Sequence, residues 1–449
     1  MDGAQLRDLF QKILPSDLIE AHVAELGIQE RVRKLDVNAL LQAMVICGGN
    51  HRFGTQAGML HRYVANGCPE VTRAAFYSWF TDDLAQLMER LSANACGWVA
   101  SRPAHLCGLL AGRTDWRVVD ATTVKLPVAL QGVFPGDGDY AALKLHVEYS
   151  LGVENIVDYT ISPARDHESR HLVIDARRRG QGLLVDLGYA SHGVLDACET
   201  HDVRYVIRVK KGWEFWFDGL ASDEERAAWI DDGSLDERFG AEDLDKAKEV
   251  VDIDVTVGGP TSMRRVRLVA FTTPKGRVMF LTNLPRETHS HAEVGLVYRL
   301  RWSVELANKL CKSAMSVEEI FARTESSARI VVHAAMLAAM LAQAIAHEEH
   351  VARGWSGDRR RAIKEAPIHP LAVAAKLNRL SGDLGSALAD PDRPLHLWDR
   401  YAVVLVKMSA DPNWRTKPSA LDVVKGRTYK LVATHDYATD PVATLARLK

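Results

Sequence analysis

The spacing of apolar residues predicts helices through roughly the first 110 residues of the chain. Leu84, Leu87, Met88 and Leu91 stand at positions i, i+3, i+4 and i+7. This spacing places their side chains on one face of a helix. We therefore expect an all-α region over residues 1–110.

Two shorter stretches inside this region flank a turn. Residues 55–60 and 72–79 can each open a short helix, and the segment 65–69 between them contains Gly67 and Pro69, which favour a turn. Two short helices around a glycine-containing turn are compatible with helix-turn-helix DNA binding. Ordinary helical packing explains the same spacing equally well.

From about residue 116 the pattern changes to short β-rich runs separated by helical ones. The predicted elements, in chain order, are strands at 116–119, 144–151 and 155–161, a helix at 171–179, a strand at 183–185, a helix at 191–199 and a strand at 204–209. The order βββαβαβ matches a ribonuclease H-like α/β fold, although periodicity alone also allows other α/β sheets.

The segment 212–283 interrupts this rhythm. An acidic run over 223–249 is followed by β-like runs, and from about residue 290 the pattern is helical to near the end. We expect a helical domain at 1–110, an α/β core at 111–211 and 284–345, a β-rich insertion at 212–283, and a helical C-terminal region at 346–449.

Composition indicates a globular chain and leaves the choice of partner open. The chain has 449 residues, 47% of them hydrophobic and 25% charged, with a net charge of −2. These values exclude a disordered or fibrous chain and give no bulk electrostatic argument for nucleic acid. Six cysteines without a Cys-x-x-Cys pair favour reduced thiols over a disulfide framework or a zinc site.

Neither export nor membrane insertion is indicated. The N-terminus carries Asp2 and Asp8 and lacks the long apolar run of a secretory signal. The most apolar run, 330–346, is interrupted by His333 and Gln343, which favours a buried helix over a membrane span. We expect a soluble cytoplasmic protein.

Two of the predicted strands end in an aspartate, Asp120 and Asp186. The carboxyl ends of strands in an α/β sheet are where such proteins bind ligands. An aspartate at a strand end also commonly caps a turn or helix, so this pattern alone leaves both roles open.

A stronger pattern lies in the segment 298–312. On a helix, Tyr298, Arg301, Glu305 and Lys312 fall within about 60° of one another. Trp302 and Lys309 fall close to that face, and leucines line the opposite one. A solvated face with an Arg301–Glu305 pair is the simpler explanation, but it does not account for aromatic residues on the polar side.

The spacing Tyr298-x2-Arg301-x3-Glu305-x6-Lys312 resembles the signature of the DDE transposases of bacterial insertion sequences of the IS-four type. In that family two strand-borne aspartates and the signature glutamate of a ribonuclease H-like core hold divalent metals. Asp120, in Val-Val-Asp-Ala-Thr-Thr-Val, and Asp186, in Val-Asp-Leu-Gly-Tyr, resemble the two aspartates. The long gap from Asp186 to Glu305 suits the family's β-rich insertion.

Three carboxylates without cysteine suit Mg²⁺ or Mn²⁺. Two ions per active site could serve an in-line phosphodiester displacement, with Asp120 bridging both and Asp186 and Glu305 each completing one side. Further DNA-contact candidates, whose simpler alternative is a solvated or core position, are Tyr298, Arg301, Trp302, Lys309, Lys312, Lys210 and Lys211.

The resemblance implies cut-and-paste transposition through a hairpin intermediate. It also implies that residues 1–110 bind the DNA ends, that the α/β core is catalytic, and that residues 346–449 serve DNA contact or dimerisation. The partners would be the terminal inverted repeats and target DNA, held by a homodimer without any membrane association, in the cytoplasm at the nucleoid. Two alternatives remain open: a metal-dependent nuclease of the same fold, and a non-catalytic DNA-binding protein derived from a transposase.

Overall fold

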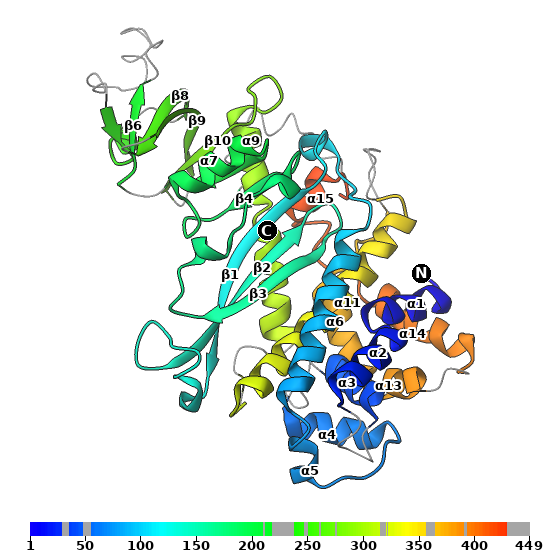
Figure 1. The fold of residues 1–449 in the computed structure, drawn as a ribbon. Helices are drawn as coiled ribbons and strands as arrows, with labels where there is room; N and C mark the ends of the chain where they lie inside the picture. Colours follow the sequence, from blue (N-terminus) through cyan, green and yellow to red (C-terminus); the bar gives the residue numbers. More distant parts are fainter. Residues whose placement is uncertain are drawn as a thin grey trace.

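A computed structural model describes most of the chain. The described residues are 1–28, 36–47, 55–209, 212–217, 238–246, 250–259, 262–273, 276–314, 320, 322–355, 364–389 and 393–428. The architecture is mixed α/β, with one large sheet beside a helical body (Figure 1).

Ten strands among the described residues form a single sheet in the order β3-β2-β1-β4-β5-β10-β9-β8-β6-β7. Their bounds are β1 Trp116–Leu126, β2 Ala141–Ser150, β3 Asn155–Pro163, β4 Gly182–Val185, β5 Arg204–Arg208, β6 Glu214–Phe217, β7 Arg238–Gly240, β8 Val250–Gly259, β9 Ser262–Thr273 and β10 Gly276–Thr282. Strands β1, β2 and β3 form the predicted antiparallel meander, and β4 and β5 continue it in parallel with β1.

The centre of the sheet is apolar on both faces, as expected for strands covered on both sides. Val118 and Leu184 face the helical body, whereas Val119 and Val185 face the side of α7 (His192–Thr200). A Cβ on Gly182 would lie 2.2 Å from the buried Trp116 ring. Only glycine therefore lets β4 pair closely with the start of β1.

The helical predictions for the two ends of the chain are confirmed. The N-terminal helices are α1 Gly3–Ile13, α2 Ser16–Leu26, α3 Val37–Cys47, α4 Gln56–Ala65, α5 Arg73–Tyr77 and α6 Asp82–Ala100. The later helices are α9 His291–Arg299, α10 Trp302–Lys309, α11 Glu325–Ala352, α12 Pro370–Arg379, α13 Ser381–Ala389, α14 Leu395–Lys407 and α15 Ala420–Val424.

The two short helices predicted around Gly67 are α4 and α5. The hydroxyl oxygens of Thr55 and Thr72 accept hydrogen bonds from the backbone N–H groups three residues later, at 3.1 and 3.2 Å, and so cap the two helices. Gly67 has a φ of +87° in the turn between them, a conformation that favours glycine.

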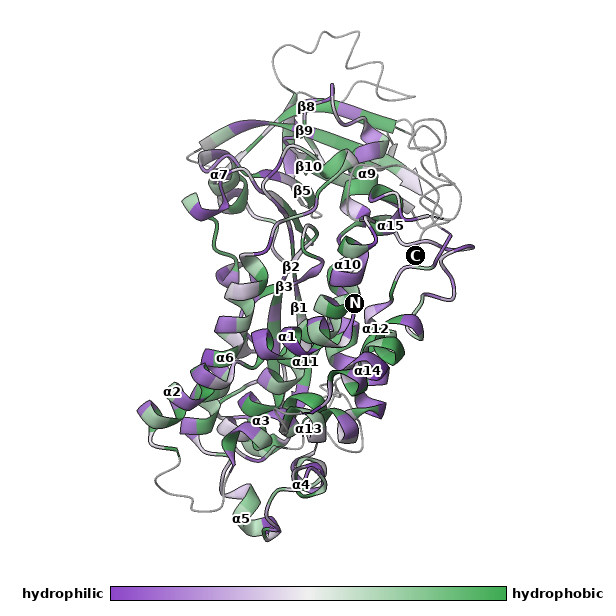
Figure 2. Ribbon diagram, turned by 90° about the vertical axis from the view of Figure 1, so that its right-hand side faces the viewer, coloured by the Kyte–Doolittle hydropathy of each residue, from purple (hydrophilic) through white to green (hydrophobic). Residues whose placement is uncertain are grey.

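Helix α11 is the centre of the helical body. It packs against α1, α3, α6, α12 and β3. The helices around it carry both hydrophilic and hydrophobic residues (Figure 2). By length and composition it could cross a membrane, but 94% of its most apolar window is buried inside the protein. The prediction of a buried helix at 330–346 is confirmed.

The helix predicted at 171–179 is wrong, and the element order is therefore ββββαβ. The structure has two short 3₁₀ turns there, Glu168–His171 and Ala176–Arg178. The Asp175 carboxylate accepts a hydrogen bond from the Arg177 backbone, and Arg178 forms an ion pair with Glu148 of β2. These bonds stabilise a turn at the expense of helical backbone bonding.

The predicted end of the first strand at Asp120 is also wrong. Strand β1 continues to Leu126 because its antiparallel ladder with β2 runs on through Asp120, which lies opposite Val147. Only the parallel pairing with β4 stops before Asp120, at Val119 and Val185.

The segment 212–283 is β-rich in its described parts, as predicted. Its strands extend the main sheet, since β10 pairs antiparallel with β5. They also share an apolar cluster with α7, β4 and β5. Most of the acidic run at 223–249 lies outside the described residues.

Candidate active site

Neighbouring parallel strands place Asp120 and Asp186 at the same level of the sheet. The last parallel pair is Val119 opposite Val185, and each aspartate is the next residue along its strand. Side chains alternate along a strand, so Asp120 points to the same face as Val118. That face is covered by α10, which contacts β1 and β2.

The segment that carries Tyr298, Arg301, Glu305 and Lys312 is not the single helix that the spacing predicts. Helix α9 ends at Arg299 and α10 begins at Trp302, and the N–H of Arg301 bonds to the carbonyl of Tyr298 at 2.9 Å in a tightened turn. Leu300, in the break, and Val304, after it, are both fully buried, so the tightened turn keeps both against the core.

Five of the predicted residues are joined by polar contacts around the two aspartates. The Tyr298 hydroxyl donates a hydrogen bond to Asp186 Oδ1 at 3.1 Å. The Arg301 guanidinium forms an ion pair with Glu305 and lies 3.8 Å from Asp120 Oδ1. The structure therefore brings Asp120 and Glu305 to the Arg301 guanidinium and joins Asp186 to Tyr298, three residues before Arg301.

Asn308 completes this arrangement, although it is absent from the residues predicted from sequence. Its Nδ2 donates a hydrogen bond to Asp120 Oδ2 at 2.9 Å. On the predicted helical wheel Asn308 falls about 20° from Arg301. The signal was therefore present, but a polar residue at such a position is more often a surface residue than a site residue.

The electrostatics of the site follow from burial and from crowded carboxylates. Burial raises the pKa of Asp120 to about 6, with Arg301 opposing the rise and Glu305 and Asp186 adding to it. Burial and the neighbouring Asp186 also raise the pKa of Tyr298, so its phenol stays protonated. Burial opposes the charged form of Arg301, yet the pKa of Arg301 is raised by Tyr298 and the carboxylates.

The donor chemistry of the site fits a hard divalent cation. Three carboxylates offer oxygen ligands of the kind that Mg²⁺ and Mn²⁺ prefer. Within the described residues, however, no group of three or more His, Cys, Asp or Glu side chains is spaced to hold a metal ion. The Arg301 guanidinium supplies the positive charge between Asp120 and Glu305 instead.

The remaining predicted contacts lie around this centre. Trp302 is 41% exposed, with the Arg299 guanidinium 5.6 Å above its ring, and Lys309 is exposed. Lys312 lies on a π-helical segment, Leu310–Ala314, and makes no ion pair within the described part of the chain. Lys210 and Lys211 lie outside the described residues.

Three further ring side chains make packing contacts. His146 Nε2 is hydrogen-bonded to Ser162 at 2.9 Å, and burial lowers the pKa of His146 to about 3. Trp213 stacks on His192, and the Arg238 guanidinium lies 5.5 Å above the Trp216 ring. These contacts favour structural roles for the three side chains.

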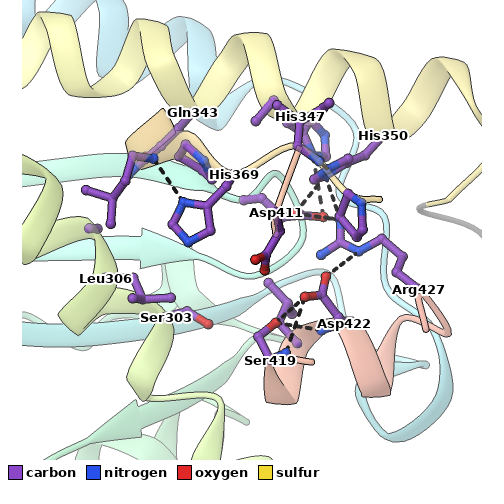
Figure 3. A pocket seen from close by; sticks show the side chains of 18 of the residues that line it. Ser303, Leu306, Gln343, His347, His350, His369, Asp411, Ser419, Asp422 and Arg427 are labelled. Carbon is purple, nitrogen blue, oxygen red and sulfur yellow. Dashed lines mark hydrogen bonds and ion pairs between the residues drawn. The ribbon is translucent and has the colours of Figure 1, made fainter. Parts of the chain in front are cut away.

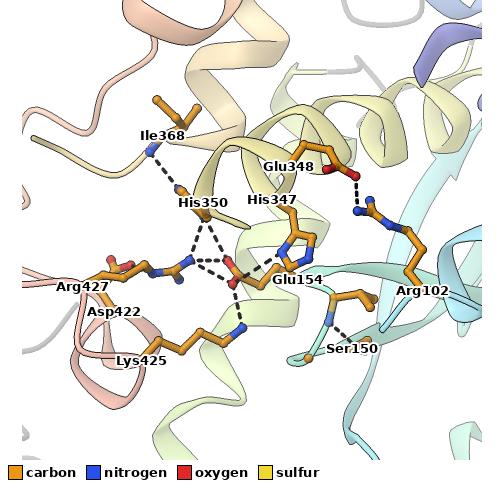
Figure 4. Close-up of polar contacts among 12 residues, drawn as sticks. Arg102, Ser150, Glu154, His347, Glu348, His350, Ile368, Asp422, Lys425 and Arg427 are labelled. Atoms are coloured by element: carbon orange, nitrogen blue, oxygen red, sulfur yellow. Dashed lines mark hydrogen bonds and ion pairs between the residues drawn. The ribbon is translucent and has the colours of Figure 1, made fainter. Parts of the chain in front are cut away.

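A second buried polar cluster lies on the other side of α10, and no sequence pattern indicated it. Glu154, in the β2–β3 turn, accepts from Lys425 Nζ at 2.7 Å and from Arg427 Nη1 at 2.8 Å (Figure 4). His347 and His350 of α11 lie 3.7 and 3.4 Å from the same carboxylate. We call these five residues the Glu154 cluster.

A cavity of about 130 Å³ adjoins the Glu154 cluster (Figure 3). Its walls come from α10, α11 and the C-terminal segment, including Ser303, Leu306, Asp411 and Asp422. The Glu154 cluster and the Asp120 site therefore flank the same helix.

Comparison with known proteins places this arrangement in a family. The model of the transposase DDE domain matches residues 112–341. This span includes β1, β4, α9 and α10, and so contains Asp120, Asp186, Glu305 and Asn308.

Two relatives are transposases by name. The transposase for insertion sequence element IS231F of Bacillus thuringiensis subsp. israelensis is 24% identical over 259 residues, which cover 48% of this chain and 53% of that protein. The putative transposase InsL for insertion sequence element IS186A of Escherichia coli (strain K12) is 24% identical over 284 residues, with 57% and 74% covered. The chain spans about half the length of the IS231 relatives that it matches.

A solved structure of a piggyBac transposase synaptic complex with hairpin DNA is also similar, at a TM-score of 0.47 and 11% identity, covering 89% of this chain and 84% of that one. The family match spans more than half of the chain, and the chain belongs to the transposase DDE domain family.

Proposed function

We propose that the chain is a DNA transposase that cuts an insertion sequence at its ends and joins it to target DNA. One observation supports the proposal: within the family match, Asp120, Asp186 and Glu305, far apart in the sequence, each contact Tyr298 or Arg301 of one short segment. The transposase names of the relatives support it.

In this proposal the three carboxylates hold two Mg²⁺ or Mn²⁺ ions. When bound, such ions activate the attacking oxygen and stabilise the leaving oxygen of a phosphodiester displacement. The sheet order β3-β2-β1-β4-β5, with β4 and β5 parallel to β1, supports a ribonuclease H-like core around them.

The neighbouring side chains would hold the DNA strand. Arg301 carries a charge that burial does not remove and can bind a phosphate, and the protonated Tyr298 hydroxyl can donate to one. Trp302, Lys309 and Lys312 follow on the same segment as further contact candidates. Lys210 and Lys211 are candidates from sequence alone.

We extend the proposal to the partners of the whole protein. Double-stranded DNA, first the terminal inverted repeats and then the target, would meet a homodimeric synapse in the bacterial cytoplasm at the nucleoid. Helices α4 and α5 are candidates for reading the ends, and a hairpin intermediate is the expected route. The domain bounds 1–110, 111–211 with 284–345, 212–283 and 346–449 remain our working division.

The test is cleavage and strand transfer by the purified protein on DNA carrying the flanking ends of its own element, with Mg²⁺. We compare wild type with Glu305→Gln and with Glu325→Gln. Glu325 is a matched control because it also forms an i,i+4 pair with an arginine, Arg329, but lies on α11.

We expect wild type and the Glu325→Gln variant to cut and join, and the Glu305→Gln variant to bind DNA only. Equal cutting by all three proteins would remove Glu305 from the site. Cutting without joining by wild type would instead favour the nuclease, and binding without cutting would favour the non-catalytic DNA-binding protein.

A further inference from the structure

The hydrogen bond from Asn308 to Asp120 lies outside the four-residue signature. Asn308 is one helical turn beyond Glu305 on α10 and is only 6% exposed. Its Nδ2 is 2.9 Å from Asp120 Oδ2. Asn308 therefore contacts Asp120, one proposed metal ligand, and lies on α10, the helix that carries Glu305, a second proposed ligand.

Charge fixes the orientation of the Asn308 amide. An ionised carboxylate can only accept hydrogen bonds, so the amide nitrogen must face Asp120 and the amide oxygen must face away. That oxygen, Asn308 Oδ1, is buried and has no hydrogen-bond partner in the described part of the chain. A buried acceptor without a partner costs free energy and calls for an explanation.

The two oxygens of Asp120 are consequently held in different surroundings. Oδ2 accepts from the neutral Asn308 amide, whereas Oδ1 faces the Arg301 guanidinium at 3.8 Å. The backbone of Asp120 is fixed within the ladder of β1 and β2, so the side-chain torsions are its remaining freedom. A hydrogen bond to one oxygen removes that freedom and aims the other.

We propose that Asn308 is a positioning residue for Asp120. It holds the carboxylate so that Oδ1 is presented to a divalent cation, and its own Oδ1 accepts from a water that arrives with that cation. This inference rests on the proposed function for the identity of the cation, but not on cleavage itself.

The experiment is titration of Mn²⁺ into the DNA-free protein, followed by calorimetry and by electron paramagnetic resonance of the free ion. The variants are Asn308→Ala, Asn308→Leu and Asn308→Gln. Leucine keeps the buried volume and removes the donor, and glutamine keeps the amide. Asn94→Leu, at an exposed position of α6, is the matched control.

We expect the alanine and leucine variants to lose about 10- to 100-fold in Mn²⁺ affinity, the range found for outer ligand partners. Glutamine should restore part of the loss, and the Asn94 control should bind as wild type. In the cleavage assay the leucine variant should have a lower kcat that a higher Mn²⁺ concentration restores in part, whereas added Mn²⁺ would not restore activity lost to a smaller fraction of folded protein.

Each outcome decides the inference. A folded Asn308→Leu protein with wild-type Mn²⁺ affinity would overturn it, as would wild-type protein that binds no Mn²⁺. If alanine prevents folding, the leucine and glutamine variants carry the comparison. If wild type binds Mn²⁺ but never cuts DNA, the proposed function fails while the affinities still test Asn308.

Discussion

Two buried carboxylate clusters flank α10, and they differ in charge balance. In the Glu154 cluster, Lys425 and Arg427 meet Glu154, and Arg427 also pairs with Asp422 at 3.0 Å. Burial opposes the charged form of Glu154, yet Arg427 and Lys425 hold the pKa of Glu154 well below its ordinary value. Two carboxylates meet two cations, and the charges cancel.

The Asp120 site lacks this balance. Arg301 pairs with two carboxylates, Asp186 adds a third nearby, and burial raises the pKa of Asp120 to about 6. A buried charge without compensation is costly, so such an excess marks a site that awaits a cation or carries function. The Glu154 cluster fastens the C-terminal segment to the β2–β3 turn, whereas the Asp120 site is held ready for a ligand.

The largest effect should come from Asp120→Asn. We expect a loss of cleavage of at least about 10³-fold, the upper range for removing one preorganised electrostatic group. Stability should be unchanged or higher, because the substitution removes one unbalanced buried charge. The measurements are single-turnover cleavage and urea unfolding. An Asp120→Asn variant that cuts normally, or that unfolds far more easily than wild type, would contradict the assignment of the Asp120 site to function and of the Glu154 cluster to stability.

Glu154→Gln should have the opposite profile. Removing the Glu154 charge leaves Lys425 and Arg427 buried without this partner. Because an uncompensated buried charge is costly, we expect the free energy of unfolding to fall by about 3–5 kcal/mol. The control is Glu348→Gln, which breaks the partly exposed pair with Arg102 and should cost about 0–1 kcal/mol. Urea unfolding decides the matter, and equal effects of the two variants would contradict a structural role for Glu154.

A divalent cation should stabilise the folded protein by binding at the Asp120 site and not at the Glu154 cluster. Mg²⁺ at one hundred times its dissociation constant should add about 2.7 kcal/mol to the free energy of unfolding. The increment should vanish in Asp120→Asn and persist in Glu154→Gln. Thermal melting with and without Mg²⁺ measures it, and an increment that survives Asp120→Asn would move the cation elsewhere.

Acid pH should affect the two clusters in opposite directions, with the smallest expected change at Asp120. Its pKa is raised from 3.8 to about 6 in the folded protein, so the folded state binds more protons between these values and the contribution of Asp120 falls as pH rises through them. Glu154 has a lowered pKa, so its contribution is present above its ordinary pKa and is lost as pH falls below it.

The check is the stability difference between each variant and wild type, without divalent cation, from pH 7 down to 4. As the pH falls towards 4, the free energy of unfolding of wild type should rise relative to that of Asp120→Asn. Wild type should remain more stable than Glu154→Gln throughout. A difference from Asp120→Asn that does not change with pH would argue against the raised pKa.

The parts of the fold that could be predicted from sequence were those that depend on local patterns of residues. The strands around Asp120 and Asp186 and the spacing from Tyr298 to Glu305 could be recognised because periodicity and spacing are local. The turn at Arg301 and the missing helix near Asp175 could not, because tertiary packing and ion pairs decide them. Glu154 and Lys425 are 271 residues apart, a contact that no local pattern records.

The most direct measurement is an anomalous difference map from crystals grown with Mn²⁺ and DNA. The account predicts Mn²⁺ peaks bounded by Asp120, Asp186 and Glu305, with Arg301 withdrawn from Glu305 to a phosphate and Asn308 still bonded to Asp120. Mn²⁺ bound at other residues, with Arg301 still paired to Glu305 in the presence of DNA, would contradict it.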